Sequence, residues 1–316
     1  MNKRLWILIL PWILFANEPK TNHEFGYISH STINIGDDFQ AIAAMRFLPK
    51  NAIGVDREFI SQFEYPTLLH TVVSGWFMHT KMGYWELTTP PPEKAWPPSN
   101  ALAPFFISFH ISPSFFSEAF TEEGIEYLKN HAPIGARDLP TLRILQEKGI
   151  PSYFSGCLTL TLENPFKERD EIIYLVDVDD EVADYIKKNC SSPIVRTTQG
   201  KPLLHFLSKE HRLKYAEYIL NLYRKAKCVI TTRLHVALPC LAFETPLLVL
   251  SEPLVDPRFD GLIEHIRHCS KKDLLEEKAS YNFDNPPPNF NTHLKLRTNL
   301  IKTMEEYVDS TEHDSR

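Results

Sequence analysis

Two arginines stand where anions commonly bind, at points where a predicted strand leads into a predicted helix. Arg137 lies in the segment Gly135-Ala136-Arg137-Asp138, and Arg233 lies in Thr231-Thr232-Arg233-Leu234-His235. In open α/β sheets, ligands gather beyond the carboxyl ends of strands, where helix N-termini present free amides. A guanidinium beside such amides is suited to binding a carboxylate or a phosphate. Each arginine also has a simpler explanation, an ion pair with a local acid such as Asp138.

His235 follows Arg233 by two residues, in the first turn of the predicted helix. The positive end of the helix dipole disfavours a charged imidazolium there, unless a bound anion restores it. His235 is therefore a candidate general acid, a proton donor whose charge depends on the bound ligand. The alternative is a histidine with a purely structural role.

The elements that position these residues alternate along the chain. Short apolar runs predict strands at 52–55, 68–74, 105–109, 172–176, 228–231 and 247–250. Amphipathic stretches between them predict helices at 37–47, 121–130, 139–148, 181–189, 209–226 and 234–242. Such alternation is typical of a parallel sheet covered by helices on both faces. The sequence therefore predicts an α/β protein.

The alternation starts afresh near Glu171, after a polar and turn-rich stretch at 163–170. We therefore predict an N-terminal α/β domain at 21–165 and a C-terminal α/β domain at 166–308. The second domain ends in a predicted helix at 292–308. A hydrophobic segment at 1–20 precedes the two domains and a polar tail at 309–316 follows them. Two proline-rich stretches, at 90–98 and 282–291, are predicted loops.

Composition and glycine spacing exclude several classes of protein. The 316 residues carry 34 Lys and Arg against 40 Asp and Glu, and the resulting charge of −6 argues against a nucleic-acid partner. No two glycines lie closer than Gly149 and Gly156, so the dinucleotide fingerprint, the P-loop and the GxSxG elbow are absent. Five scattered cysteines predict free thiols. We predict no cofactor.

Three groups that resemble metal sites or nucleophiles have simpler explanations. The acidic run at 177–180 follows a predicted strand, and its carboxylates suit a hard cation, but acids before a helix also cap it. His265, His268 and Cys269 lack a second ligand pair at zinc spacing and are expected at a helix end. Cys157 stands in apolar surroundings and is expected to be a buried structural thiol. We predict no metal site.

The first residues resemble a targeting signal. Lys3 and Arg4 precede an apolar run at 5–16 that Pro11 interrupts. A membrane-spanning helix needs about 20 apolar residues, so this run is too short to be one. A charged start before an apolar centre is typical of a secretion signal. The alternative is a hydrophobic N-terminal strand or an interfacial segment.

Six short segments occur in a fixed order between residues 26 and 262. They are Asn34-Ile35-Gly36-Asp37-Asp38, Ser74-Gly75-Trp76-Phe77, Ser108-Phe109-His110, Gly135-Ala136-Arg137-Asp138, Ser155-Gly156-Cys157-Leu158-Thr159-Leu160-Thr161 and Thr232-Arg233-Leu234-His235. In content and order they resemble the polysaccharide pyruvyl transferase family, with its N-terminal Gly-Asp turn and its Arg-Leu-His element. The second segment keeps one glycine, Gly75, where many members have a glycine-rich turn.

This resemblance implies two Rossmann-like domains that face a cleft, as in GT-B glycosyltransferases, with the last helix crossing back to the first domain. It implies phosphoenolpyruvate as the donor and a sugar bearing a pyruvate ketal as the product. Arg233, Leu234 and His235 match donor-site residues, and Arg137 matches a second anion-binding arginine. Both arginines would then face a common cleft and neutralise the carboxylate and the phosphate of the donor.

The acceptor would be a glycan or a lipid-linked saccharide, and we place it beside Gly36, Gly75 and Trp76. His235 is the candidate acid that protonates the methylene carbon of the donor. The sequence leaves the base for the attacking sugar hydroxyl open among three candidates: Asp37, Asp38 and His110. The two aspartates are equally well explained as helix-capping carboxylates, and His110 as a histidine that bonds to backbone at a strand end.

Two other functions use the same fold. One is a glycosyltransferase with a nucleotide-sugar donor, and the other is a non-catalytic glycan-binding relative. Intact Arg137, Arg233 and His235 favour an enzyme. Phosphoenolpyruvate is a cytosolic metabolite, whereas the charged and apolar start of the chain favours export. We expect a cytoplasmic protein that associates with a membrane through residues 5–16, with a secretion signal as the alternative.

Overall fold

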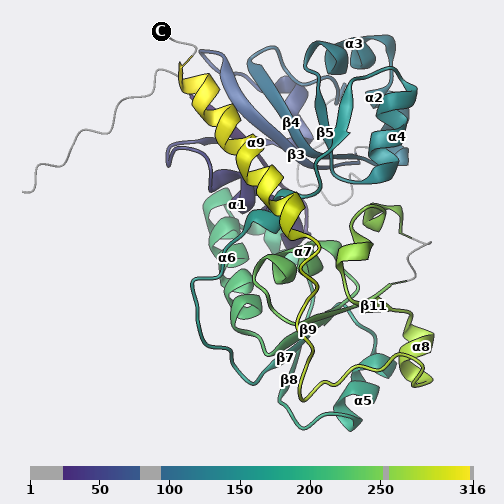
Figure 1. Cartoon of the computed structure of the whole chain (residues 1–316). Helices are drawn as coiled ribbons and strands as arrows, with labels where there is room; N and C mark the ends of the chain where they lie inside the picture. The colour runs from purple at the N-terminus through teal and green to yellow at the C-terminus, as the bar shows by residue number, and fades with distance from the viewer. Residues whose placement is uncertain (1–23, 79–93, 252–255, 314–316) are drawn as a thin grey trace, which may run out of the picture.

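Two separate parallel sheets form the framework of the computed structural model, which describes residues 24–78, 94–251 and 256–313 (Figure 1). The first sheet has the strand order β2-β1-β3-β4-β5-β6. Its strands are Phe25–Ser29 (β1), Ile53–Asp56 (β2), Leu69–Phe77 (β3), Leu102–Ile111 (β4), Ile134–Ala136 (β5) and Ser152–Phe154 (β6).

The second sheet has the strand order β11-β10-β9-β7-β8. Its strands are Ile173–Val176 (β7), Ile194–Thr197 (β8), Cys228–Thr231 (β9), Leu247–Leu250 (β10) and His268–Cys269 (β11). Every strand pairing within the two sheets is parallel. Two parallel sheets with connecting helices are two Rossmann-like domains, which confirms the predicted GT-B-like fold class. The predicted boundary between residues 165 and 166 falls between β6 and β7.

The six helices predicted between the strands all occur, and their ends differ from the predicted ones by at most two residues. The helices are Ile35–Met45 (α1), Phe116–Ala119 (α2), Glu122–Asn130 (α3), Leu139–Glu147 (α4), Asp180–Lys188 (α5), Lys209–Lys225 (α6), Leu234–Ala242 (α7), Lys271–Leu275 (α8) and Leu294–His313 (α9). Asp138 caps α4, since its Oδ1 accepts a hydrogen bond of 3.1 Å from the Thr141 amide. Short 3₁₀ turns include Arg57–Gln62 (η1), Leu158–Thr161 (η4), Pro202–Phe206 (η5), Pro257–Phe259 (η6) and Ile263–His265 (η7).

The strand predictions were less complete. All six predicted strands occur, but β1, β5, β6, β8 and β11 were not predicted, and most of them have only two to four residues. The expectation of a helix end around His265, His268 and Cys269 was wrong. That stretch forms η7 and then β11, which pairs with β10.

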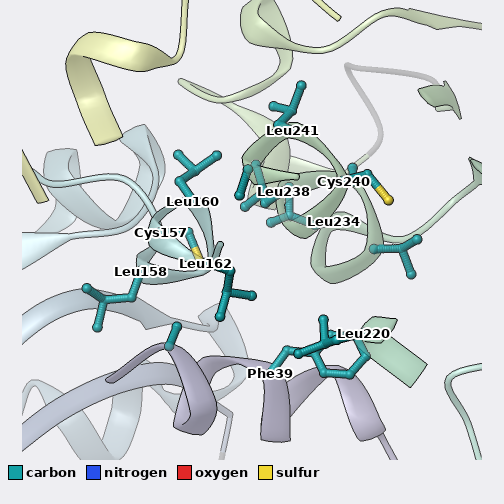
Figure 2. Packing of buried hydrophobic residues seen from close by; sticks show 14 of the residues in the cluster. Phe39, Cys157, Leu158, Leu160, Leu162, Leu220, Leu234, Leu238, Cys240 and Leu241 are labelled. Atoms are coloured by element: carbon teal, nitrogen blue, oxygen red, sulfur yellow. The ribbon is translucent and has the colours of Figure 1, made fainter. Parts of the chain in front are cut away.

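The two domains share one hydrophobic core. Helices α1 and α7 lie between the sheets (Figure 1), and side chains from both helices meet those of η4. Figure 2 shows this packing, with Phe39 from α1, Leu158 from η4 and Leu238 from α7 in the same cluster. Because a large apolar interface resists relative motion, this core holds the carboxyl ends of the two sheets in a defined orientation.

Helix α9 crosses back to the first domain, as the resemblance implied (Figure 1). The ring of Tyr307 stacks on that of Phe105 of β4, with centroids 4.1 Å apart. At the start of α9, Arg297 Nη1 donates to the carbonyls of Leu160 and Ala242, 3.1 and 3.0 Å away, and so links both domains. The predicted polar tail at 309–316 needs one correction, because α9 stays helical as far as His313.

A bulge in the first sheet positions two residues of the predicted site. The register of β3 against β4 shifts between Val73 and Gly75, and Gly75 has a φ of +114°. Ser108 of β4 also has a positive φ, +56°, and its Oγ accepts the Leu158 amide at 2.8 Å. Bulges re-aim side chains and are common beside functional sites. Here the bulge is followed directly by Trp76 on β3, which pairs with His110 on β4.

A cavity of about 890 Å³ borders the linker between the sheets, but none of the predicted site residues lines it. Two arginines that line this cavity donate hydrogen bonds to backbone carbonyls. Arg169 Nη2 donates to the Phe243 carbonyl at 3.0 Å, and Arg224 Nε donates to the Glu163 carbonyl at 2.8 Å. These bonds join the linker to the second domain. We therefore interpret the polar groups around this cavity as structural.

Some predictions concern residues outside the described ranges. They are the hydrophobic segment at 1–20, with its apolar run at 5–16, and residues 90–93 of the first proline-rich loop. Among the helices inside the described ranges, none combines the length and the apolarity that crossing a bilayer requires.

Candidate active site

Four buried polar side chains form a continuous chain of contacts between the two domains. His110 lies on β4, Arg137 and Asp138 follow β5, and His235 lies in the first turn of α7. His110 Nδ1 is 2.5 Å from Asp138 Oδ2, which is 3.3 Å from Arg137 Nε. Arg137 Nη1 is in turn 3.4 Å from His235 Nε2. The structure thus brings together three predicted site residues, His110, Arg137 and His235, through Asp138.

The contact with Asp138 orients the imidazole of His110. Burial alone would raise the pKa of Asp138, but hydrogen bonding and charge from His110, with Arg137, lower it. An ionised carboxylate only accepts hydrogen bonds, so His110 Nδ1 carries the hydrogen and Nε2 is left as an acceptor. Burial and the Arg137 guanidinium lower the pKa of His110 to about 4, although Asp138 acts in the opposite direction. At neutral pH, His110 therefore has the form of a general base.

His235 is neutral in the ligand-free protein. A guanidinium only donates, so the contact with Arg137 requires His235 Nε2 to be an acceptor without a hydrogen. Burial lowers the pKa of His235 well below its ordinary value, and the positive charges of Arg137 and Arg258 lower it further. An anion that neutralises these guanidiniums would raise the pKa of His235. The ligand-dependent charge that the sequence predicts for His235 stays a prediction.

A second guanidinium, Arg258 of η6, faces this centre. Its Cζ lies 4.9 Å from the centroid of the Trp76 ring, which lies 6.2 Å from the ring of His110. The charge of Arg258 lowers the pKa of both His110 and His235, as that of Arg137 does. The two histidines therefore lie near the same two guanidiniums.

Each of these guanidiniums also has a carboxylate partner, Asp138 for Arg137 and Asp256 for Arg258, where Asp256 Oδ2 is 2.6 Å from Arg258 Nη2. Guanidiniums are suited to binding a small anionic ligand, which would compete with these carboxylates.

Among the described residues, no hydrogen bond or ion pair links Arg233 to this centre, and the expected pairing of Arg137 with Arg233 in a common cleft stays a prediction. Arg233 Nε is 2.9 Å from Asp177 Oδ2, and the Arg233 side chain is 45% exposed. Leu234 is 4% exposed and packs in the shared core (Figure 2), so only its backbone is available to a ligand. Donor-binding roles for Arg233 and Leu234 stay predictions.

Asp38 forms a buried ion pair between the domains. Its Oδ2 is 2.7 Å from Nη2 of Arg212 on α6, and Arg212 Nη1 also donates to the carbonyls of Thr32 and Leu204, at 2.6 and 3.2 Å. Burial raises the pKa of Asp38 to about 6, although Arg212 acts to lower it. We interpret Asp38 as a structural group, because its carboxylate is occupied by a guanidinium whose Nε, Nη1 and Nη2 all donate hydrogen bonds within the protein.

We expect Asp38→Asn to lower the free energy of unfolding by about 3–5 kcal/mol, because it leaves the charge of Arg212 buried without a counter-ion. Urea denaturation measures this loss. Asp180→Asn is the control, since its pair with Arg196 is exposed and worth at most about 1 kcal/mol. A well-folded Asp38→Asn protein with a hundredfold lower kcat would instead indicate that Asp38 is the base.

Asp37 and Gly36 lie where α1 meets α7. Asp37 Oδ2 accepts from Thr32 Oγ1 at 3.0 Å and is 3.4 Å from Arg57 Nη1. A Cβ at Gly36 would lie 3.0 Å from His235 Cβ, so this glycine allows the two helices to approach closely. Gly36 therefore has a packing role next to the catalytic candidate His235, and an acceptor role for it stays a prediction.

The acidic run at 177–180, which the sequence also explained by helix capping, is paired with basic side chains. In the acidic run, Asp177 pairs with Arg233, Asp179 with Lys271 and Asp180 with Arg196. Cys157 is fully buried, and burial raises the pKa of its thiol. Within the described ranges, no three His, Cys, Asp or Glu residues are placed to hold a metal ion.

The sequence interpretation missed two residues of the centre. Arg258 lies shortly after the strand predicted at 247–250, so the rule that ligands gather at strand ends applied there as well. Asp138 was considered as an ion-pair partner of Arg137. Its contact with His110 was not visible in the sequence, because it depends on the pairing of β4 with β5.

The fold and the site together define a GT-B-like α/β protein with a buried cluster of arginine and histidine side chains between its two domains. The sequence matches the polysaccharide pyruvyl transferase family over residues 34–252, more than two thirds of the chain, and the protein belongs to this family. The matched range includes His110, Arg137, Asp138 and His235.

Comparison with solved structures found seven matching chains. One is described as an S. aureus MnaA–UDP co-structure; the match has a TM-score of 0.44 and 12% sequence identity, and it covers 89% of this chain and 98% of the other. The likeness is distant, and the fold class follows from the two parallel sheets themselves. No curated protein matched the sequence.

Proposed function

We propose that the protein transfers the pyruvyl group of phosphoenolpyruvate to two hydroxyls of a hexose in a surface polysaccharide or its precursor, and so forms a cyclic ketal. The observation that carries this proposal is the contact of Arg137 with His235, 3.4 Å between Nη1 and Nε2, beside the second guanidinium of Arg258. Phosphoenolpyruvate has a carboxylate and a phosphate, each a bidentate partner for a guanidinium. Family membership supports the same donor.

His235 is the proposed general acid. Binding of the donor neutralises the guanidiniums, and the imidazole then takes up a proton. Transfer of this proton to the methylene carbon of the donor makes a methyl group and leaves an oxocarbenium-like centre on the neighbouring carbon. A sugar hydroxyl adds to that carbon, the bond to phosphate breaks, and phosphate leaves with the electron pair. A second hydroxyl of the same sugar then adds and closes the ring.

His110 is the proposed base for the attacking hydroxyl. Of the three candidates that the sequence left open, Asp38 is occupied by Arg212, and Asp37 Oδ2 is held by Thr32 and Arg57. His110 keeps Nε2 as an acceptor because Asp138 binds its Nδ1–H group. The two hydroxyls together release two protons. One replaces the proton that His235 gave to carbon, and the other leaves with phosphate.

The proposal is tested by incubating the protein with phosphoenolpyruvate and hexose glycosides or lipid-linked saccharides, and by measuring the products by mass spectrometry. A product heavier by one pyruvate ketal, with release of phosphate, is expected. Thermal shift measurements with phosphoenolpyruvate and with nucleotide sugars separate the two possible donors. Stabilisation by a nucleotide sugar alone would contradict the proposal and favour the glycosyltransferase alternative.

We expect Arg137→Lys and Arg258→Lys each to weaken phosphoenolpyruvate binding by about 10- to 100-fold. A lysine keeps the charge but loses a bidentate contact worth about 1.5–3 kcal/mol. Isothermal titration calorimetry measures the change in Kd. Arg196→Lys, in an exposed ion pair with Asp180, is the control and leaves Kd unchanged. A greater loss for Arg233→Lys than for Arg258→Lys would favour the sequence-based pairing of Arg137 with Arg233.

A further inference from the structure

Several buried polar atoms next to the candidate active site lack partners. The side-chain amide of Gln40, on α1, is 1% exposed, and neither its Oε1 nor its Nε2 has a hydrogen-bond partner among the described residues. Within the same described part of the chain, Asp37 Oδ1 and Trp76 Nε1 are also buried without a partner. Proteins rarely leave buried polar atoms unsatisfied, because each one lowers stability. A group of them marks a place where a polar ligand completes the hydrogen bonds.

Gln40 lies against the bulge of β3, and Asp37 is linked to the backbone of this bulge through Arg57. Asp37 and Gln40 lie three residues apart and therefore share one face of α1. A Cβ built on Gly75 would lie 3.8 Å from Gln40 Nε2, 3.9 Å from Gln40 Oε1 and 3.5 Å from His30 Nε2. Trp76 follows Gly75 directly, and its carbonyl accepts a 2.8 Å hydrogen bond from Arg57, which also contacts Asp37. The place of the missing Cβ beside Gly75 is thus bordered by the Gln40 amide and by His30 Nε2.

The chemistry of these side chains is suited to hydroxyl groups. A carboxylate oxygen such as Asp37 Oδ1 only accepts, an indole nitrogen only donates, and the amide of Gln40 does both. A hydroxyl also donates and accepts, so one hydroxyl beside Gly75 can bond to the Gln40 amide. An anionic group is repelled by Asp37 and is drawn instead to the guanidiniums of Arg137 and Arg258. The side chain of Trp76 adds an apolar face of the kind on which sugar rings pack.

We propose that Gln40 binds one of the two sugar hydroxyls that the pyruvyl group bridges. This inference rests on the proposed function and adds to it the part of the site that selects the acceptor. Gln40 exchanges no proton and acts as a specificity-determining residue. Its amide holds one hydroxyl in place while the other is presented to the donor.

The test is Gln40→Leu, which replaces the unpartnered amide by an apolar group of similar size. The Tm is expected to stay equal or to rise, because the substitution removes a buried unsatisfied group. The Kd for phosphoenolpyruvate is expected to stay within twofold, and the KM for methyl hexopyranosides to rise at least tenfold. Gln199→Leu is the matched control: Gln199 is equally buried, but its Nε2 donates to the His235 carbonyl at 3.3 Å, so its replacement lowers the Tm.

Deoxy sugars identify the group that Gln40 contacts. Removing one of the two bridged hydroxyls from the acceptor is expected to weaken its binding at least tenfold in the wild-type protein and less than threefold in Gln40→Leu. Gln40→Met provides a second variant of similar volume. An active wild-type protein with equal KM values for wild type and both variants would overturn the inference. A wild-type protein that does not bind phosphoenolpyruvate would instead contradict the proposed function.

Discussion

Replacement of His235 by glutamine is expected to lower kcat by about 100- to 10,000-fold, the usual contribution of a positioned general acid. Glutamine keeps a hydrogen-bonding group toward Arg137 Nη1, which is 3.4 Å from His235 Nε2, but it cannot deliver a proton to carbon. The Kd for phosphoenolpyruvate is expected to change less than threefold, because the guanidiniums of Arg137 and Arg258 remain. Single-turnover kinetics and calorimetry measure the two effects separately.

A protonation measurement distinguishes an acid from a structural histidine at position 235. In the free protein, burial and the two guanidiniums hold the pKa of His235 well below its ordinary value. Binding of the anionic donor is expected to raise this pKa, because negative charge favours the imidazolium form. Nuclear magnetic resonance of the ring with and without phosphoenolpyruvate follows the shift. Full activity of His235→Gln, or a pKa that does not rise, would refute the acid role.

The helices and the longer strands could be predicted from the sequence because their signals are local. Helix α4, for example, has a capping Asp138 at its start and Gly149 just after its end. Length alone does not explain the strands that were missed, since β1 has five residues, one more than the predicted strands β7 and β9. Strand β5, with three residues, exists because its neighbours β4 and β6 supply hydrogen-bond partners that lie far away in the sequence.

The residues of the candidate site could likewise be predicted only in part from the sequence. Arg137 and His235 could be found because each stands at a strand end or a helix start, where the fold presents free amides. The roles of Asp37 and Asp38 could not be separated, although the two are adjacent. Their difference comes from Arg212, which is 174 residues away from Asp38 and reaches it only because α6 packs against α1. Arg233 has the same kind of local signal as Arg137, but its guanidinium pairs with Asp177, a partner that the sequence analysis did not predict.

The second large effect is expected for Asp138→Asn, which should lower kcat by about 100- to 10,000-fold without unfolding the protein. Asparagine caps a helix as well as aspartate does, so α4 is preserved. An amide can however donate to His110 Nδ1, which lies 2.5 Å from Asp138 Oδ2, and this would move the imidazole hydrogen to Nε2. His110 could then no longer accept a proton from the sugar hydroxyl. A similar change in the serine protease triad lowers kcat by about 10⁴ through the wrong tautomer.

The pH dependence of kcat/KM provides a second test of the role of Asp138. Below its pKa of about 4, His110 becomes protonated and cannot act as the base, so kcat/KM of the wild-type protein is expected to fall as the pH drops through about 4. Asp138 raises this pKa, and its replacement is therefore expected to move the acidic limb to lower pH. Asp179→Asn, at the matching cap of α5, is the control and changes neither kcat nor the profile. If Asp138→Asn behaves like Asp179→Asn, then Asp138 is only a helix cap, and the base must be sought elsewhere, first at Asp37.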